Sequence, residues 1–215
     1  MIPERNKIIC GDVLDVLKTF DDCIFDLVIT SPPYNLGGDF HTGWRTIDGY
    51  KNVRYGGYAT HNDNMNETDY QLWQIKIMNE LYRVTKEDGN FFYNHKNRIK
   101  DFKIISPYEW ILNTKWTLRQ EVIWDTTNQI NQDARRFIPC HEQIYWFSKT
   151  RTHLDNTGER LNDCWIFRNK LKRKDTMHPA TFPIELINRL LSVVPDAKLV
   201  LDPFMGSGTT ALACI

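Results

Sequence analysis

Continuous apolar runs alternate along the chain with segments of helical periodicity. Two runs near the start, "KIIC" at 7–10 and "FDLVIT" at 25–30, predict short buried strands. Aliphatic runs of this kind are typical of parallel strands that helices cover on both faces. Between them, "GDVLDVLKTF" at 11–20 predicts a turn followed by a helix with one apolar face.

A longer helix is predicted over residues 68–85. One of its faces carries larger side chains at helical spacing, namely Leu72, Ile75, Met78 or Asn79, and Tyr82. "KEDG" ends this helix, and "NFFYNH" at 90–95 predicts a third strand. A short helix is expected from Pro107 to Asn113.

The rest of the pattern completes an α/β arrangement. Residues 119–125 and 142–148 predict an antiparallel pair, 182–194 an amphipathic helix, and "KLVLD" at 198–202 a last parallel strand before a helix that begins in "GSGTTALACI". Strands that alternate with helices predict a doubly wound, mostly parallel sheet. Two polar segments, 35–66 and 149–177, lack a clear period, and loops as long as the first are usually functional or mobile.

Composition narrows the functional classes. Lys and Arg total 27, as do Asp and Glu, and this neutral balance argues against a strongly basic protein that binds nucleic acid without regard to sequence. None of the five cysteines is paired at metal-ligand spacing, so we predict no metal site and reduced thiols in a cytoplasmic protein. The charged N-terminus is not a secretory signal, and no apolar run approaches the about 20 residues of a membrane span.

Unusual chemistry lies at the carboxyl end of the strand at 25–30, where the chain reads "ITSPPY". Pro32 and Pro33 have no N–H, so the backbone there offers carbonyl acceptors without competing donors. Ser31 adds a hydroxyl, and Tyr34 adds a flat ring. Acceptors beside a stacking surface suit a planar group that carries an NH2, such as cytosine or adenine.

The strand at 198–202 ends in a comparable way, in "LDPFMGSGTT". Gly206 and Gly208 allow a ligand to approach the backbone closely, and no lysine follows them, so this is not a phosphate-binding P-loop. Taken alone the loop is equally consistent with a tight turn. Asp202 either holds an amine or caps a helix, and Asp12 has the same two interpretations. In open α/β sheets, ligands collect beyond the carboxyl ends of the strands.

Five blocks of the sequence, in their order along the chain, resemble those of an amino-methylating DNA methyltransferase of the beta class. The matching blocks are "GDVLDVL" (11–17), "TSPPY" (30–34), "HEQIYWFSK" (141–149), "HPATFPIELINRLL" (178–191) and "LDPFMGSGTT" (201–210). The resemblance covers about 7–34, 68–94 and 120–215. It implies a circular permutation of the S-adenosylmethionine-dependent methyltransferase fold, with the catalytic motif before the cofactor motif.

The resemblance also implies roles for individual residues. Ser31 Oγ and the Pro32 carbonyl would accept hydrogen bonds from the target NH2, and Tyr34 would stack on the base after it is flipped from the duplex, with Pro33 completing the catalytic motif. Transfer would be direct and need no nucleophilic cysteine. The residues implied for S-adenosyl-L-methionine are Asp12, Val13, Thr30, His178, Pro179, Phe182, Pro183, Asp202, Pro203, Phe204, Gly206, Ser207, Gly208 and Thr209. His141 and Glu142 are expected to orient structure at a strand start.

Duplex DNA is the implied partner. Segment 35–66 mixes aromatic and basic residues and would form a DNA-facing flap, and 149–177 would recognise the target. The basic residues expected to contact DNA are Arg45, Arg54, Lys170, Lys172, Arg173 and Lys174. The alternative interpretations are a disordered surface loop for the flap and a solvated face for the run at 168–174. The implied organisation is a catalytic part at 1–148, a recognition segment at 149–177 and a cofactor-binding part at 178–215.

Three questions stay open at this stage. Ser31 favours cytosine N4 as the site-specific target, with adenine N6 as the alternative.

The family sheet has another strand after the cofactor helix, whereas the sequence stops at Ile215. We therefore expect a truncated chain with one strand missing between 198–202 and 7–10, and weak cofactor binding. The competing classes are an inactive remnant that only binds DNA, and a methyltransferase for RNA or another amine. The oligomeric state is not predicted, and a restriction endonuclease is a conceivable second partner.

Overall fold

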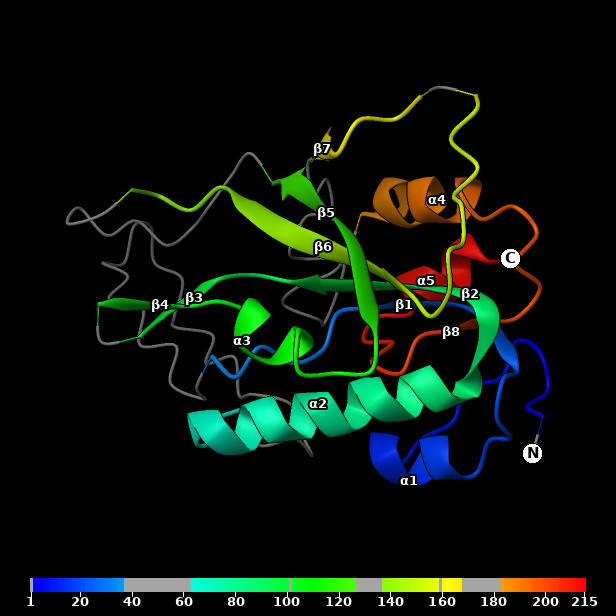
Figure 1. The fold of residues 1–215 in the computed structure, drawn as a ribbon, viewed down its shortest axis with the longest axis horizontal. Helices are drawn as coiled ribbons and strands as arrows, with labels where there is room; N and C mark the ends of the chain where they lie inside the picture. Colours follow the sequence, from blue (N-terminus) through cyan, green and yellow to red (C-terminus); the bar gives the residue numbers. More distant parts are fainter. Residues whose placement is uncertain (1, 37–62, 101, 127–136, 159, 168–182) are drawn as a thin grey trace, which may run out of the picture.

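The computed structural model describes residues 2–36, 63–100, 102–126, 137–158, 160–167 and 183–215. Its main sheet has the strand order β7-β5-β6-β2-β1-β8 (Figure 1). The strands are β1 (Phe25–Thr30), β2 (Thr85–His95), β5 (Thr117–Asp125), β6 (His141–Ser148), β7 (Cys164–Ile166) and β8 (Val200–Leu201). β2 and β8 both pair in parallel with β1, β7 pairs in parallel with β5, and β6 runs antiparallel to both of its neighbours. The predicted mostly parallel sheet with an antiparallel pair is confirmed.

Helices cover both faces of this sheet. Figure 1 shows α1 (Val13–Lys18), α2 (Glu67–Val84) and α3 (Tyr108–Ile111) on one side, and α4 (Ile184–Ser192) and α5 (Thr209–Ala213) on the other. Each side has its own hydrophobic cluster, one built on α1 to α3 and the other on α4. This three-layer arrangement is the predicted doubly wound architecture.

The central strand β1 contains an aliphatic run, residues 27–29, that packs against both faces of the sheet. Val28 belongs to the cluster under α1 to α3, whereas Leu27 and Ile29 belong to the cluster under α4. Side chains alternate between the two faces of a strand, and here both faces are covered, so the three consecutive positions 27–29 are all apolar. Full burial of each such side chain contributes roughly 1.5–3 kcal/mol.

The buried face of α2 overlaps only in part with the predicted one. The helix begins where the Asn66 side chain accepts a hydrogen bond from the Thr68 amide at 3.0 Å. Its buried residues are Tyr70, Gln74, Ile77, Met78, Leu81 and Val84, whereas Leu72 is 49% exposed. Of the predicted face, Met78 is buried and Ile75 and Tyr82 pack against the core cluster, so only Leu72 departs from it. Two residues with polar groups, Tyr70 and Gln74, occupy the core face because they form a buried hydrogen-bonded network.

The predicted strand at 7–10 is also wrong, because these residues are irregular and exposed. A strand needs a neighbour to pair with, and in the described part of the chain the sheet ends at β8. Two elements were not predicted: β7, inside the polar segment 149–177, and a small hairpin of β3 (Arg98–Lys100) and β4 (Lys103–Ile105). All three of these strands are only three residues long, which leaves too few positions for a period to be recognised.

The described residues contain neither a membrane-spanning helix nor a cluster of metal ligands. No helix there combines the length and hydropathy that a membrane span requires. The cysteines, all within the described ranges, are free and exposed. No group of three or more potential metal ligands is found in that same part of the chain.

Candidate active site

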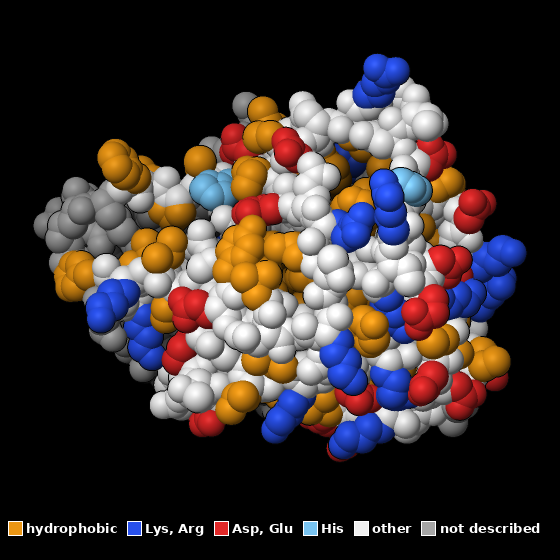
Figure 2. All heavy atoms as spheres, in the orientation of Figure 1, with side chains coloured by type: hydrophobic (Ala, Val, Ile, Leu, Met, Phe, Trp, Pro, Cys, Tyr) orange, Lys and Arg blue, Asp and Glu red, His pale blue; other side chains and the backbone are white. Residues whose placement is uncertain are grey.

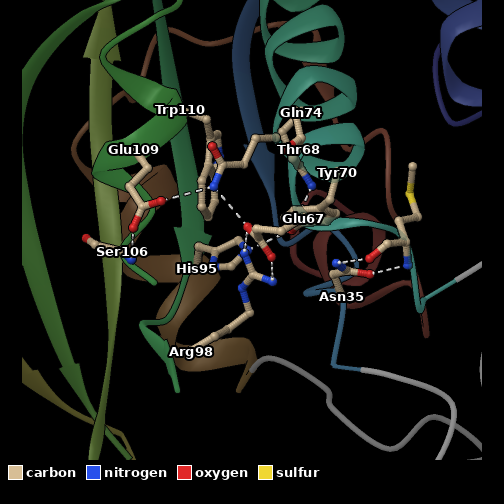
Figure 3. A network of polar contacts seen from close by, with 12 residues as sticks. Asn35, Glu67, Thr68, Tyr70, Gln74, His95, Arg98, Ser106, Glu109 and Trp110 are labelled. Carbon is tan, nitrogen blue, oxygen red and sulfur yellow. Dashed lines mark hydrogen bonds and ion pairs between the residues drawn. The ribbon is translucent and has the colours of Figure 1, made fainter. Parts of the chain in front are cut away.

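The segment after β1 is held firmly in place. β1 pairs with β2 up to Thr30, and the prolines that follow cannot donate further hydrogen bonds to the sheet. Asn35 then adopts a left-handed conformation with φ 54°, which asparagine tolerates better than most residues. Its side chain donates to the Met65 carbonyl at 3.0 Å and accepts from the Met65 amide at 2.7 Å (Figure 3). Residues 31–34 are thus fixed at both ends.

The Pro33 carbonyl is used by the fold itself. It accepts a hydrogen bond of 2.7 Å from the Tyr70 hydroxyl, which lies 2.8 Å from His95 Nε2 and also accepts from Gln74 at 2.9 Å. Since Tyr70 has one proton and gives it to Pro33, His95 Nε2 must carry a proton and donate to Tyr70. His95 Nδ1 lies 2.9 Å from the Lys96 amide nitrogen and 2.8 Å from the Lys96 carbonyl oxygen. Burial lowers the pKa of His95 well below its usual value, so the ring is neutral.

The Pro32 carbonyl differs from that of Pro33. Pro32 is buried as a residue, yet no described residue donates a hydrogen bond to its carbonyl. This carbonyl therefore stays available to a ligand that brings its own N–H. The two prolines therefore have separate roles, one in the fold and one open to a ligand.

Four side chains form a compact polar cluster beside Pro32. The Ser31 Oγ and Tyr34 hydroxyl oxygens are 2.7 Å apart, and the Tyr34 hydroxyl donates to Glu142 Oε2 at 3.0 Å. Asn94 Nδ2 donates to the Tyr34 hydroxyl at 2.6 Å and to Glu142 Oε2 at 2.8 Å, and it lies 3.5 Å from Ser31 Oγ. These four residues come from the end of β1, from β2 and from β6.

The Tyr34 ring is oriented by the same surroundings. Its centroid lies 4.3 Å from that of His95 with the planes tilted by 36°, and Lys96 Nζ is 5.4 Å from the ring. Burial of the hydroxyl, together with the Glu142 charge, raises the pKa of the Tyr34 phenol well above its usual value. Tyr34 therefore keeps its proton and acts as a hydrogen-bond donor at neutral pH.

An ion pair supports this arrangement from the side of α2. Arg98, 5% exposed in its side chain, forms two hydrogen bonds with Glu67 at 2.9 and 2.7 Å (Figure 3). Its guanidinium lies 4.7 Å from the Tyr70 ring and 5.6 Å from the Trp110 ring. Such a bidentate, stacked arginine ties the start of β3 to α2 next to Tyr70.

At the second strand end, Asp202 connects three parts of the chain. Its Oδ1 accepts from Thr30 Oγ1 at 2.8 Å and from the Phe204 amide at 3.1 Å, and its Oδ2 accepts from Thr210 Oγ1 at 2.6 Å. Burial raises the pKa of Asp202, while these hydrogen bonds oppose the shift. A carboxylate offers about four acceptor positions, so one remains for a ligand.

The glycine loop lies beside this carboxylate. Gly206 and Gly208 have φ values of 52° and 83°, in the left-handed region that favours glycine. The Gly208 amide donates to the Met205 carbonyl at 2.8 Å, which closes the turn before α5. The Phe204 ring packs edge-on against Trp73 of α2, with centroids 5.7 Å apart. Pro203, Ser207 and Thr209 belong to the same loop, so the predicted cofactor residues at 202–209 are brought together next to Thr30.

The remaining predicted residues are less closely connected to the two strand ends. Asp12 is exposed and caps α1, accepting from the Leu14 and Asp15 amides at 2.9 and 3.3 Å, so its capping interpretation is confirmed. Val13 begins α1 and packs against the core, and Pro183 is buried just before α4. Nine predicted residues lie outside the described ranges: His178, Pro179 and Phe182 for the cofactor, and Arg45, Arg54, Lys170, Lys172, Arg173 and Lys174 for DNA.

Sequence reasoning missed several members of the site. Tyr70, Asn94 and Arg98 were not singled out, and Glu142 was expected only to orient structure. A usable signal existed for Asn94, because it is a polar residue at the carboxyl end of an otherwise aromatic strand, "NFFYNH". No local pattern marks Tyr70 or Arg98, whose partners lie on other elements.

The fold, with its two adjoining strand ends, is shared with known structures. The fold is similar to that of PvuII DNA methyltransferase (cytosine-N4-specific), with a TM-score of 0.72 and 20% identity over 95% of this chain and 76% of that one. It is also similar to M1.HpyAVI in its complex with SAM, with a TM-score of 0.64 and 17% identity over 97% of this chain and 86% of that one.

The sequence comparison then gives the family. A model described as DNA methylase, of the N6_N4_Mtase family, matches residues 25–215, and the chain belongs to this family. Type II methyltransferase M.BglII of Bacillus subtilis is 28% identical over 96% of the chain, and M.ScaI of Streptomyces caespitosus is 27% identical over 94%. The chain spans 61% of the length of M.BglII and 71% of that of M.ScaI.

Proposed function

We propose that this protein transfers a methyl group from S-adenosyl-L-methionine to an exocyclic amine of a base in duplex DNA, with cytosine N4 as the target. One observation carries the proposal. The amine-accepting groups of Ser31 and Pro32 directly follow Thr30, which is hydrogen-bonded to the carboxylate at the start of the glycine loop. Acceptor site and donor site are therefore adjacent at the carboxyl edge of one sheet.

The residues at the second strand end fit the proposed cofactor. The left-handed glycines leave backbone open to a ligand, and Asp202 retains an acceptor position that suits the ammonium of the methionine end. Thr30, Pro203, Phe204, Ser207 and Thr209 would complete this part of the site. S-adenosyl-L-methionine would supply a methyl group on a positively charged sulfur, which makes its carbon electrophilic. Asp12, Val13, Pro183 and the region 178–182 are proposed to contact the rest of the cofactor.

The residues of this chain would prepare the amine for attack. In cytosine and adenine the amine lone pair is delocalised into the ring. Hydrogen bonds from the NH2 to Ser31 Oγ and to the Pro32 carbonyl favour a pyramidal nitrogen whose lone pair points toward the methyl group. Much of the rate then comes from holding amine and sulfonium in line. The Tyr34 ring would stack on the flipped base.

The choice of cytosine rests on Ser31 alone. Adenine-N6 methylation is the alternative, because an amine of either base would find the same acceptors. Methylation of RNA or of another amine, and DNA binding without catalysis, are the competing classes that the experiment below separates.

A candidate DNA-facing surface lies beside the site. The β3–β4 hairpin follows Asn94 and His95 closely in sequence, and Lys100 is directly opposite Lys103 across the two strands. Phe102 is 85% exposed. Figure 2 shows basic and hydrophobic side chains exposed together at the end of the molecule where β3 and β4 lie. Opposed lysines repel each other in isolation, and phosphates would relieve that repulsion. Segments 37–62 and 168–177 are proposed to add further DNA contacts.

The organisation implied by the sequence is kept as part of the proposal. Residues 1–148 and 178–215 would form one catalytic and cofactor-binding unit, and 149–177 would recognise the target. The site of action would be the cytoplasm, where DNA is accessible and the free cysteines stay reduced. A restriction endonuclease that cuts the same target would be the corresponding partner.

The test is methyl transfer from labelled S-adenosyl-L-methionine to unmethylated bacterial genomic DNA and, in a separate reaction, to bacterial RNA, followed by nucleoside digestion and mass spectrometry. We expect N4-methylcytosine. N6-methyladenine would show DNA methylation with adenine, not cytosine, as the target. Label in RNA only would refute the DNA assignment. A Ser31→Ala variant should lose about 100-fold or more in rate, because a preorganised hydrogen-bonding group at the reacting atom is removed. Absence of transfer by the wild-type chain at saturating cofactor would reject catalysis.

A further inference from the structure

We infer that Glu142 is a positioning residue of the proposed methylation site: through the Tyr34 hydroxyl, its carboxylate sets the direction of the Ser31 hydroxyl proton, so that Ser31 Oγ presents its lone pairs to the amine. The inference rests on the proposed function. It deepens that function, because it explains how a serine, which can donate or accept, is made to accept.

The Glu142 carboxylate can only accept hydrogen bonds. Glu142 Oε2 lies 3.0 Å from the Tyr34 hydroxyl oxygen and 2.8 Å from Asn94 Nδ2. Two oxygens at 3.0 Å without a proton between them would repel each other, so Tyr34 must direct its single proton at Glu142. Asn94 cannot supply that proton, since its own N–H groups point at both oxygens.

The consequence for Ser31 follows from proton counting. Tyr34 and Ser31 lie 2.7 Å apart, and in geometric terms either could be the donor. Because the only proton of Tyr34 is committed to Glu142, Ser31 must be the donor in this pair. The chain of hydrogen bonds therefore runs from Ser31 to Tyr34 to Glu142. Both lone pairs of Ser31 Oγ remain available to accept, with Asn94 Nδ2 only a long contact at 3.5 Å.

The direction of the hydrogen bonds, from Ser31 to Tyr34 to Glu142, also has an electrostatic effect. A hydroxyl that donates to a hydrogen-bonded chain ending in a carboxylate becomes a better acceptor, because each bond in the chain polarises the next. The raised pKa of Tyr34 ensures that the middle of the chain keeps its proton. Without Glu142, the Tyr34 proton would be free to turn toward Ser31 and occupy the lone pair that the amine needs.

Two substitutions separate this role from simple packing. Glu142→Leu removes the acceptor. Glu142→Gln keeps an oxygen that can accept from Tyr34, so the direction of the hydrogen bonds is preserved with a weaker, uncharged acceptor. We expect the single-turnover rate of methyl transfer to genomic DNA to fall about tenfold to 100-fold in Glu142→Leu and only about threefold in Glu142→Gln. The affinity for S-adenosylhomocysteine, measured by calorimetry, should be the same in both variants and the wild type.

The decisive comparison is a double-mutant cycle with Tyr34→Phe. Phenylalanine has no proton to send to Ser31, so Glu142→Leu should then change the rate by less than about threefold. An effect of Glu142→Leu that is equally large in the wild-type and Tyr34→Phe backgrounds would overturn the inference, since Glu142 would then act on Asn94 or on the strand alone.

A measurement independent of activity keeps the inference testable if catalysis is absent. Tyrosine labelled with 13C at Cζ gives one resonance per residue, and the Tyr34 signal is assigned by its loss in Tyr34→Phe. A phenol that donates to a carboxylate resonates further downfield, so the Tyr34 signal should move upfield in Glu142→Leu and much less in Glu142→Gln. An unmoved Tyr34 signal rejects the inference while leaving the proposed function intact, whereas an inactive wild-type chain with the expected shifts rejects only the proposed function.

Discussion

Thr30 Oγ1 donates a hydrogen bond of 2.8 Å to Asp202 Oδ1, and the two residues are 172 positions apart in the sequence. Their strands are neighbours, with Leu27 opposite Val200 and Val28 opposite Leu201. Parallel pairing brings the carboxyl ends of both strands to the same edge of the sheet. The bond therefore joins the strand end next to Ser31, the proposed amine acceptor, to the glycine loop, and it brings two distant motifs together.

Loss of this bond should affect both stability and cofactor binding. Thr30→Val keeps the shape of the side chain but leaves the buried carboxylate of Asp202 with one donor fewer. We expect the free energy of unfolding in urea to fall by about 1–2 kcal/mol, and the affinity for S-adenosylhomocysteine to fall as well. Thr117→Val is the matched control, because Thr117 is exposed and its hydroxyl has no hydrogen bond with the described residues. Equal effects of the two substitutions would contradict the structural role of Thr30.

The Tyr70 hydroxyl should be a large contributor to stability near the site. Tyr70→Phe leaves the Pro33 carbonyl, the His95 ring and Gln74 without a shared partner. Buried polar groups that lose their partner cost about 1–3 kcal/mol, so the unfolding free energy should drop by about that amount. Tyr82→Phe is the control on the same helix, where the hydroxyl has no such partners among the described residues and the change should be within about 0.5 kcal/mol. A neutral Tyr70→Phe would show that the Pro33 carbonyl is satisfied in another way.

Asp26 should make stability depend on pH. Burial acts to raise its pKa, but hydrogen bonds from Lys86 at 2.6 Å and from the Leu199 and Lys198 amides outweigh this, and the pKa is lowered. A lowered folded-state pKa means stabilisation that is present above the unfolded value of about 3.9 and is lost as pH falls through the folded value. Asp26→Asn should cost about 2 kcal/mol at pH 7, and the gap to the wild type should close progressively below about pH 4.

The control for this experiment is Asp196→Asn, since Asp196 is exposed and has no hydrogen bond or ion pair with the described residues. Chemical denaturation at several pH values measures both variants. A difference between the wild type and Asp26→Asn that stays constant from pH 7 to pH 3 would refute the assignment of the effect to ionised Asp26.

The β3–β4 hairpin is expected to contribute to the affinity for duplex DNA. Replacing Lys100 and Lys103 together by Gln should weaken binding to duplex DNA and reduce the slope of log affinity against log salt by about 2, if each lysine meets one phosphate. Phe102→Ala should weaken binding with little change in slope, because an aromatic side chain contacts bases rather than phosphates. Lys115→Gln is the control, because Lys115 precedes the start of β5, at the end of the sheet opposite to the carboxyl end of β2. Unchanged salt dependence in the double variant would remove the hairpin from the DNA-facing surface.

Local chemistry explains what could be predicted without coordinates. The strand at 25–30 was predicted with its observed bounds, because an apolar run that ends just before two prolines has few alternatives. The antiparallel pair of β5 and β6 and the helices at 13–18 and 184–192 were likewise recognised from their periods. The two motifs at the strand ends were found because their residues are unusual in themselves: prolines that cannot donate, and glycines that permit left-handed turns.

Partners from distant parts of the chain explain what could not be predicted. The strand expected at 7–10 is absent because strand formation needs a neighbour. The buried face of α2 includes the unpredicted Tyr70 because that side chain reaches Pro33. Glu142 looked like a structural residue at a strand start, and only the fold shows that it meets Tyr34.

The sequence by itself determined the α/β class, the central strand and the two chemically distinctive strand ends, since each depends on a few consecutive residues and their intrinsic conformational limits. The tertiary structure alone decided which polar groups are buried together, and therefore which carbonyl is free, which hydroxyl accepts and which carboxylate is shared. The physical reason is that the cost of burying a polar group is offset only by its partner in space, and neighbours in space are not neighbours in sequence.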